Sequence, residues 1–554
     1  RDYYASRGLG DVYKRQGVYR LTAADLRRMG FNDPSRVKLY GYGGHVQDEV
    51  IDADTDFDDL EEVPLYRDER GLLFFGKGLI SWSATDRRGR ATHRVNTFAK
   101  QACYFLTEGD SPRTIEKAAV SGSPQKNLDY TPANVLYKKE EYAWYQSGRN
   151  FYESANYASS NSRTYQLPVV DPVASAGGSL KVSFTAHTTK DEGDSYVTPT
   201  VDGVKLSAMR ISWSGEYDAA KEGTQTYTLN TLHEGTTGTQ VTLVSTAGVD
   251  GRLGYLELCY RRQLKMRDAF LYIRHTETVP SNFVIDANGR SGLKLWCLGR
   301  RGNPMTEYQG TWSGSTYTVP VSDPTVEYVA VDVNADFPSP SYIGEVANQN
   351  LHATPATDMV IIIPASGKLY AQAERLAEAH RSVDGLRVQI VRADQIYNEF
   401  SSGTPDATAY RRFMKMLYDR AATDADMPRY LLLFGDGMWD NRMITADTRG
   451  LNPDDYLLCY ESENSLSHTS SFVMEDYFGL LDDGEGDNLM KNKIDLGIGR
   501  FPVTTEAEAK ILVDKTVDYM ENKYAGSWRN VICVMGDDGN NNCLLYTSPS
   551  PRDA

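Results

Sequence analysis

The sequence lacks several features that would indicate common classes of protein. No apolar run approaches the roughly 20 residues that a membrane-spanning helix needs, and no CxxC pair indicates a zinc site. Lys and Arg number 59 against 75 Asp and Glu, which gives a net charge of −16 without any long basic run. Because phosphate binding needs clustered Lys and Arg, nucleic acid is a poor partner for this chain.

Cysteine and histidine are both scarce. Outside the C-terminal segment, the widely spaced thiols are Cys103, Cys259, Cys297, Cys459 and Cys533. We interpret each as a small buried hydrophobe. The 8 His are scattered; His380 lies on the apolar face of an expected helix and His468 in a Ser-rich insertion. The sequence therefore offers no complete pair of nucleophile and base.

The two ends of the chain translate one DNA element. A DNA sequence that encodes SRGLGDVYKRQ, at Ser6 to Gln16, has a reverse complement that encodes CLLYTSPSPR when read from its second base. That second run occupies Cys543 to Arg552. Inverted ends of this kind are typical of a sequencing-library adapter and stand outside fold arguments. We interpret residues 1–16 and 543–554 as adapter-derived, and expect the natural protein to continue beyond 17–542 at both ends.

What the sequence does contain favours several domains, mostly of β structure. Its 554 residues include 36 Tyr and 46 Gly, with many Ser and Thr. Residues 17–139 mix a short helix, capped by Thr22, with strands, which predicts an α+β module. Over 140–335 apolar and polar residues alternate between turns, which predicts an antiparallel sandwich or jelly roll. Residues 336–357 read as a Pro-rich linker.

From residue 358 onwards, continuous apolar runs alternate with amphipathic helices. We expect strands at 359–363, 386–391, 430–434, 494–498 and 531–535. One intervening helix is capped by Asp406, and another opens with a capping box from Thr505 to Glu508. Apolar strands separated by helices are typical of a parallel sheet covered on both faces. The expected fold is multidomain: an α+β and β-sandwich region followed by an α/β domain with a mainly parallel sheet.

Glycine and aspartate follow two of the expected strands. In open α/β sheets, ligands bind beyond the carboxyl ends of the strands. We expect the glycines to permit a tight exit and the carboxylates to face that crevice, although turns built from Asp and Gly are the simpler alternative. The residues concerned are Gly435, Asp436, Gly437 and Asp440 after one strand, and Gly536, Asp537 and Asp538 after the other.

Two further patterns are incomplete. Gly435 to Gly437 does not extend to GxGxxG because Asp440 stands at the next required position, which disfavours nucleotide binding. The acidic run DDGEGD at 482–487 resembles a calcium loop, but Ile494 stands where an EF-hand that begins at Asp483 needs its glutamate. We favour a hairpin turn there over a calcium loop.

Four segments resemble the gingipain-type family of cysteine peptidases. They are QIYNEFSSGTPDATAYRRFMKMLYDRA (395–421), YLLLFGDGMWDNR (430–442), DLGIGRFPVTTEAEAKILVDKTVDYM (495–520) and SWRNVICVMGDDG (527–539). Upstream, GVYRLTAADLRRMGF, KLYGYGG, SGRNFYESANY and VANQNLHA are similar to the regions that precede the peptidase domain in the sortases of this family. The resemblance covers almost all of residues 17–542.

The resemblance implies a caspase-like fold in which a base His and a nucleophilic Cys each follow a strand. Neither loop occurs in this sequence, so we expect both to lie beyond residue 542 and the printed chain to be inactive. The acidic position that orients the His in this family matches Asp538, with Asp537 as its neighbour. The implied function is removal of a C-terminal secretion signal from cargo, coupled to attachment of the cargo to anionic lipopolysaccharide.

The implied partners are secreted cargo proteins with C-terminal signal domains, outer-membrane components of type IX secretion and a lipopolysaccharide acceptor. The implied location is the outer membrane or cell surface. The resemblance implies no specific cofactor and is compatible with bound calcium. Two alternatives stay open: a secreted gingipain-like endopeptidase, and a non-catalytic surface protein that serves adhesion or scaffolding.

Overall fold

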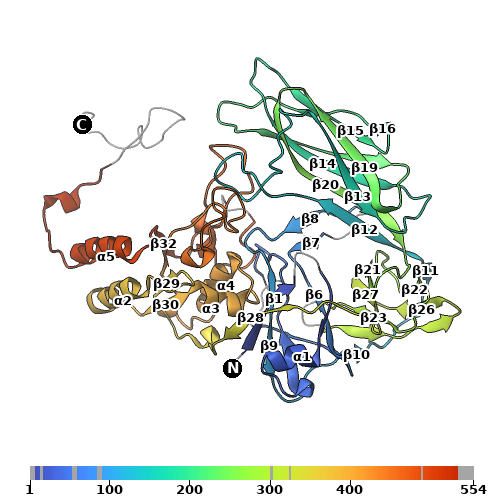
Figure 1. The fold of residues 1–554 in the computed structure, drawn as a ribbon. Coiled ribbons are helices and arrows are strands. Elements are labelled where there is room, and N and C mark those ends of the chain that lie inside the picture. Colours follow the sequence, from blue (N-terminus) through green and yellow to red (C-terminus); the bar gives the residue numbers. More distant parts are fainter. Residues whose placement is uncertain are drawn as a thin grey trace.

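The computed structural model describes residues 6–12, 16–52, 59–83, 90–299, 304–323, 326–487 and 491–533, the first of these as backbone only. Figure 1 shows three β-rich units beside one α/β unit. This arrangement confirms the expected multidomain fold, with a parallel sheet in the C-terminal part. In these residues no helix is long and apolar enough to cross a membrane.

The N-terminal module combines small sheets with one short helix. The Thr22 hydroxyl accepts a hydrogen bond from the Asp25 N–H, and the Asp25 carboxylate accepts one from the Thr22 N–H, so a capping box starts the helix. Leu21, Leu39 and Leu106 contribute to the core. The elements are β1 (Ser6–Val12), β2 (Gly17–Leu21), α1 (Ala23–Arg28), β3 (Val37–Tyr40), β4 (Glu62–Val63), β5 (Tyr66–Asp68), β6 (Gly71–Gly76), β7 (Ile80–Trp82), β8 (His93–Val95), β9 (Ala102–Glu108) and β28 (Ser341–Val346).

Strand β1 lies within the segment that we interpret as adapter-derived. Its backbone pairs with β28 on one side and with β9 on the other, so residues 6–12 form a strand inside a sheet, which the sequence did not predict. Backbone hydrogen bonds in a sheet join groups that every residue except proline carries. The pairing therefore does not depend on which side chains residues 6–12 carry.

Two β-sandwiches follow, where the sequence predicted one sandwich or jelly-roll region. In the first, Leu180, Val182 and Phe184 point inward at alternate positions of one strand, as a half-buried strand requires. Its sheets run β12-β20-β14-β18 and β13-β19-β15-β16, with β17 paired to β15. Its strands are β12 (Tyr130–Tyr137), β13 (Ser162–Val169), β14 (Gly178–His187), β15 (Ser195–Val201), β16 (Val204–Lys205), β17 (Met209–Ile211), β18 (Lys221–Leu229), β19 (Gly235–Ser245) and β20 (Asp250–Gln263).

The second sandwich has its own core, which includes Phe283, Leu295 and Tyr328. Its sheets run β10-β24-β23-β27-β21 and β11-β22-β26-β25. Its strands are β10 (Glu116–Lys117), β11 (Lys126–Leu128), β21 (Phe270–Arg274), β22 (Ser281–Asp286), β23 (Leu293–Cys297), β24 (Thr306–Tyr308), β25 (Thr311–Ser313), β26 (Thr316–Val321) and β27 (Glu327–Asp332). Strands β10, β11 and β12 precede the expected boundary at residue 139, and β28 lies in the expected linker, because each finds its pairing partner far away in the sequence.

The C-terminal domain is a four-stranded parallel sheet in the order β30-β29-β31-β32. Side chains alternate between its faces: Val360 and Leu433 pack toward α3 and α4, whereas Ile361 and Phe434 pack toward α2 and α5. Helices thus cover both faces, as predicted. The elements are β29 (Met359–Ile363), α2 (Tyr370–Ala379), β30 (Val388–Arg392), α3 (Ala393–Phe400), α4 (Thr408–Asp419), β31 (Tyr430–Phe434), β32 (Gly497–Phe501) and α5 (Glu506–Met520).

Three expectations for this domain need correction. The strand expected at 494–498 is β32 and begins three residues later, and helix α3 was not expected. The strand expected at 531–535 does not form over its described part: Val531 and Ile532 are 71% and 87% exposed. Burial of both faces of such a strand needs a covering element on each face, and β32 is already the edge of the sheet among the described residues.

One carboxylate joins the starts of three neighbouring strands. Asp358 directly precedes β29, Arg387 precedes β30 and Arg429 precedes β31. The Asp358 carboxylate accepts from Arg387 Nε (2.9 Å), from the Arg387 backbone N–H (2.8 Å) and from Arg429 Nη2 (3.0 Å). These hydrogen bonds, led by that from Arg387, hold the pKa of Asp358 at about 2. The carboxylate is therefore ionised wherever the protein is folded near neutral pH.

The segment between β31 and β32 packs against the N-terminal half of the chain. Arg149 pairs with the Glu49 carboxylate (2.5 Å), and its Nε donates to the backbone oxygen of Glu461 (2.9 Å). Glu461 is 2% exposed, and its Oε1 atom has no hydrogen-bond partner. Burial raises the pKa of Glu461 to about 8, against the opposing charge of Arg149. This carboxyl group is therefore protonated at neutral pH.

Replacement of Asp358 by Asn should weaken the sheet. We expect Asp358→Asn to lower the stability at pH 7 by about 1 kcal/mol, since both guanidinium groups are partly exposed to solvent. The depressed pKa makes the contribution complete above the ordinary value of 3.8 and removes it as the pH falls through about 2. Urea unfolding between pH 7 and pH 3 should show that the free energies of unfolding of the wild type and Asp358→Asn approach each other below pH 4. Asp426→Asn, which loses one exposed contact to Arg387, is the matched control; equal effects of the two variants would contradict this account.

Glu461→Gln should stabilise the protein at alkaline pH. The folded carboxyl group keeps its proton up to about pH 8, whereas the unfolded one releases it above 4.5, so the wild type loses stability as the pH rises through that interval. Glutamine removes this loss. We expect the melting temperatures of the two proteins to converge near pH 4.5 and to differ by on the order of a few degrees at pH 8.5. The exposed neighbour variant Glu463→Gln should show no such divergence, and parallel curves for Glu461→Gln would exclude a buried neutral carboxyl.

Candidate active-site crevice

The carboxyl end of β31 opens into the crevice expected at this edge of the sheet. Asp436 is half-buried there: its backbone N–H donates to the Val503 oxygen (3.0 Å), and its own oxygen accepts from the Leu457 N–H (2.8 Å). One carboxylate oxygen accepts from the Gly437 N–H (2.9 Å). Asp436 thus lies at the strand end as predicted, and it also forms the turn that was the simpler interpretation.

The glycines beside Asp436 are needed for close packing. A Cβ atom at Gly435 would lie 2.7 Å from Pro364 Cγ, and one at Gly437 would collide with the Cys459 sulfur. Neither glycine adopts a positive φ. The predicted tight exit is therefore a close approach of the loop to its neighbours and does not depend on a left-handed backbone.

Asp440 does not face the crevice, which corrects the sequence-based expectation. It is fully buried, and its Oδ2 atom accepts from the backbone N–H groups of Ile444 and Thr445 (2.8 Å each) and from the Thr448 hydroxyl (2.6 Å). Asp and Asn commonly organise turns in this way. Its role is to fix the shape of the loop that leaves β31.

Arg500 is a positioning residue that sequence reasoning missed. From β32 it donates to the backbone oxygen of Gly435 (3.0 Å) and of Leu458 (3.3 Å), and its Nε pairs with the Glu475 carboxylate (2.5 Å). The planar guanidinium holds three segments with one side chain. The one sequence signal for Arg500 is its place in a Gly-Arg-Phe run directly after the apolar strand expected at 494–498.

Asn441 fixes the crevice from the other side. Its side chain bonds both the N–H (2.8 Å) and the carbonyl (2.9 Å) of Cys459. Beside it lies a small apolar cavity of about 100 Å³, to which Ala365 after β29, Ala393 after β30 and Met438 after β31 contribute. We call this the strand-end cavity. It can receive one apolar side chain of a ligand.

Two buried thiols, Cys103 and Cys459, are poor nucleophiles. Burial raises the pKa of Cys103 to about 11 and that of Cys459 to about 12, and the thiolate is the reactive form. Cys259 and Cys297 are buried too, as expected. Cys533 is exposed, which corrects its interpretation as a buried hydrophobe, and it follows a 3-10 turn and not a strand of the sheet.

The two histidines singled out in the sequence have structural partners. His380 Nδ1 lies 2.7 Å from the Asp384 carboxylate, and the His468 ring packs on Tyr145 at a centroid distance of 4.7 Å. Asp537 and Asp538, the candidates to orient a catalytic His, lie outside the described residues together with Gly536. No catalytic pair is therefore assembled from the described candidates.

The acidic loop at 482–487 uses its carboxylates within the protein. Lys415 pairs with Asp483 (2.8 Å), and the Tyr418 hydroxyl donates to Asp482 (3.0 Å). The lysine ammonium next to Asp483 opposes a bound cation. Over the part of the chain that the structure describes, no group of three or more His, Cys, Asp or Glu is placed to hold a metal ion.

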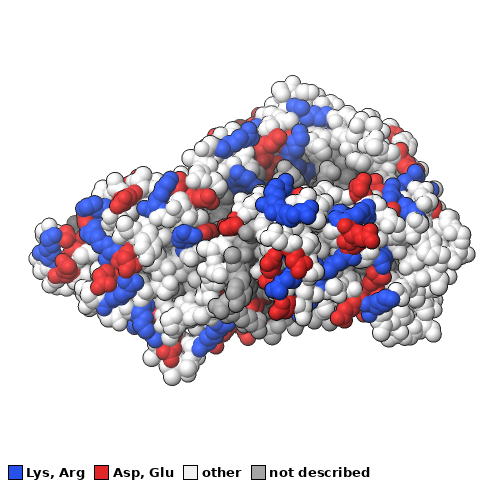
Figure 2. All heavy atoms as spheres, turned by 60° about the horizontal axis from the view of Figure 1, so that its bottom comes forward, with Lys and Arg blue, Asp and Glu red and all other residues white. Residues whose placement is uncertain are grey.

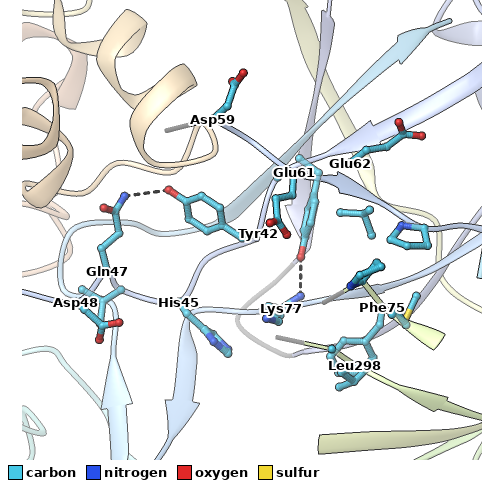
Figure 3. Close-up of a pocket in the computed structure, with 18 of the residues that line it drawn as sticks. Tyr42, His45, Gln47, Asp48, Asp59, Glu61, Glu62, Phe75, Lys77 and Leu298 are labelled. Atoms are coloured by element: carbon cyan, nitrogen blue, oxygen red, sulfur yellow. Dashed lines mark hydrogen bonds between the residues drawn. The ribbon is translucent and has the colours of Figure 1, made fainter. Parts of the chain in front are cut away.

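A larger cavity of about 360 Å³ lies between the N-terminal module, the second sandwich and α4. Figure 3 shows Glu61 and Tyr42 on one side of it and Phe75 and Leu298 on another. Burial lowers the pKa of His45 in its wall to about 3, so that this imidazole is neutral. The mixed polar and apolar lining fits a small ligand, but the residues differ from those of the crevice.

Charges of both signs are mixed on one face of the molecule. On the face drawn in Figure 2, Lys and Arg side chains are interspersed with Asp and Glu, and no continuous basic stripe is visible. A surface of this kind does not concentrate the positive potential that phosphate backbones require.

Comparison with known proteins places the crevice in a recognised domain. Residues 352–552 match the model of Peptidase family C25. The structure of dimeric latent PorU from Porphyromonas gingivalis superposes with a TM-score of 0.82 at 29% identity, over 95% of this chain and 50% of that one. The chain thus spans about half the length of that relative.

More distant structures add no information. A family two carbohydrate esterase from Clostridium thermocellum covers 71% of this chain and 98% of its own, at 10% identity and a TM-score of 0.15. An acetyl xylan esterase from Butyrivibrio proteoclasticus, at the same identity and TM-score, covers 72% and 99%. No curated protein matches the sequence. The family model and the PorU superposition together identify the chain as a PorU-like member of the C25 family of cysteine peptidases.

Proposed function

We propose that the chain belongs to a cell-surface sortase, a cysteine peptidase that removes the C-terminal secretion signal from cargo and joins the cargo to anionic lipopolysaccharide. The observation that carries the proposal is the similarity to PorU over 95% of the chain, which includes the three β-rich units as well as the C25 domain. For a general endopeptidase of the same family, we would expect similarity in the peptidase domain alone, without the three β-rich units. Membership of the type IX secretion pathway, with its outer-membrane location and partners, is part of the same proposal.

The chemistry of the proposal requires a thioester. A thiolate attacks the scissile carbonyl, the signal peptide leaves with a proton from the base, and the acyl-enzyme is resolved by water or by an amine acceptor. In this scheme the cargo tail binds across the carboxyl ends of β29 and β31, with one apolar side chain in the strand-end cavity. Arg500 and Asn441 hold the walls of that site in place.

The printed chain should supply this scaffold without the catalytic pair. Its described thiols at Cys103 and Cys459 are buried and protonated, so neither can attack. Asp538, or its neighbour Asp537, would orient the base His of the complete protein. No bound calcium is required by any step.

Cleavage of a cargo protein tests the proposal. The printed chain and the product of the complete gene are each incubated with a cargo that carries its C-terminal signal, and the products are identified by mass spectrometry. We expect cleavage by the complete protein alone, with transfer to an added amine acceptor. Cleavage by the printed chain would contradict the claim that it lacks the catalytic His and Cys. Indiscriminate cleavage of unrelated proteins would favour a general endopeptidase. Absence of cleavage by an intact complete protein would favour adhesion or scaffolding.

The carboxylate proposed to orient the base gives a second test in the complete protein. Asp538→Asn should lower kcat by about tenfold or more, with little change in KM, because the base would lose its orienting partner. Asp537→Asn is the matched control and should retain activity. Equal losses in both variants, or a loss in Asp537→Asn alone, would move the role away from Asp538.

A further inference from the structure

The N-terminal module contributes a side chain to the strand-end cavity. Phe98, which lies between β8 and β9, lines this cavity together with Ala365, Ala393 and Met438 of the C-terminal domain. It is 4% exposed and belongs to the hydrophobic core between the parallel sheet and helices α3 and α4. One wall of the candidate crevice therefore comes from a residue that lies far before the sheet in the sequence.

Asn96 fixes the turn that carries Phe98. Its side chain is fully buried, and its Oδ1 atom accepts from the backbone N–H groups of Phe98 (2.9 Å) and Ala99 (3.1 Å). Its Nδ2 atom donates to the Gly44 oxygen (3.0 Å) in the same module. An asparagine that binds the backbone two and three residues ahead stabilises a turn. Phe98 thus reaches the cavity from a backbone that is held within the N-terminal module.

The same module holds the loop between α3 and α4, which supplies Pro405 to the cavity. The Thr404 hydroxyl accepts from the Cys103 N–H (3.0 Å). The Asp406 carboxylate accepts from the Gln47 N–H (3.0 Å). Figure 1 shows the N-terminal module beside α3 and α4. Two parts of the cavity wall therefore depend on contacts between the N-terminal module and the C-terminal domain.

The chemistry of the cavity restricts what it can receive. Asp454 is the one charged residue among the described residues that line it, and it is exposed. Asn441 uses both polar ends of its amide on Cys459. Burial of a charged side chain without a partner is costly, so the cavity favours an uncharged apolar one. Its volume of about 100 Å³ is below the roughly 300 Å³ at which pockets for drug-sized ligands begin, which suits a single side chain.

We propose that Phe98 determines which apolar side chain of the cargo tail the strand-end cavity accepts. Its ring bounds the cavity, which therefore admits an aliphatic side chain such as that of leucine in preference to a larger aromatic one. The inference rests on the proposed function for the identity of the ligand. It adds that the N-terminal module is part of the substrate site, because the C-terminal domain alone would lack this wall.

Binding of small probes to the printed chain tests the proposal without any cleavage. N-acetyl-leucine methylamide and N-acetyl-tryptophan methylamide are titrated separately, and binding is followed by ligand-detected NMR. We expect the wild type to bind the leucine probe about tenfold more tightly than the tryptophan probe. Phe98→Leu enlarges the cavity, so it should strengthen binding of the tryptophan probe and remove this preference.

A change of preference distinguishes a wall of the cavity from a purely structural role. Phe74→Leu is the matched control, because Phe74 is a fully buried residue of the core of the N-terminal module and does not line the cavity. It should leave the preference unchanged, and melting curves establish that each variant is folded. Phe98→Met, which changes the side-chain volume less, replaces Phe98→Leu if the latter does not fold.

Two results would overturn the proposal. The first is a folded Phe98 variant that keeps the wild-type preference or weakens both probes by the same factor. The second is the absence of binding of either probe to the wild type at about 10 mM.

Cleavage by the complete protein separates this inference from the proposed function. Apolar residues near the cleavage site of a cargo peptide are changed one at a time from leucine to tryptophan. At one of these positions, Phe98→Leu should raise kcat/KM for the tryptophan peptide relative to the leucine peptide. Absence of cleavage by the wild type would contradict the proposed function and leave the probe measurements to decide the role of Phe98. Cleavage with a preference that does not respond to Phe98→Leu at any position would overturn the inference alone.

Discussion

The ionic contact at Asp358 determines the geometry on which the rest of the C-terminal domain depends. One buried carboxylate binds the residues that precede β30 and β31, and it also precedes β29, so three parallel strands start in a common register. Strands that start together and have similar lengths also end together, about 17 Å away at roughly 3.3 Å per residue. The crevice at their carboxyl ends is thus defined by a contact at the opposite edge of the sheet.

The crevice is then shaped by side chains that hold backbone. Arg500 binds two carbonyl groups, Asn441 binds both polar groups of Cys459, and buried Asp440 organises the loop after β31. Each of these side chains holds neighbouring backbone, and their common effect is a fixed wall around a small apolar cavity.

The sequence predicted the class of the C-terminal domain because its strands are apolar on both faces. It placed β32 three residues too early, since IDLGIGRF offers apolar residues to either register, and it missed the eight-residue helix α3. Asp436 was expected at the carboxyl edge of the sheet because it stands two residues after the end of an apolar strand. Arg500 was not, because its role depends on a partner 65 positions away. Several strands also pair across the expected domain boundaries, because pairing over long sequence separations leaves no local pattern.

The central claim of this account is that the cargo tail binds at the strand-end crevice and not on the β-rich units. Photo-cross-linking of a C-terminal signal peptide to the protein, with the cross-linked residues mapped by mass spectrometry, tests it most directly. The account predicts cross-links to residues 436–443 and to Ala365. Cross-links confined to the two sandwiches would contradict it, and would make binding through those units the basis of function.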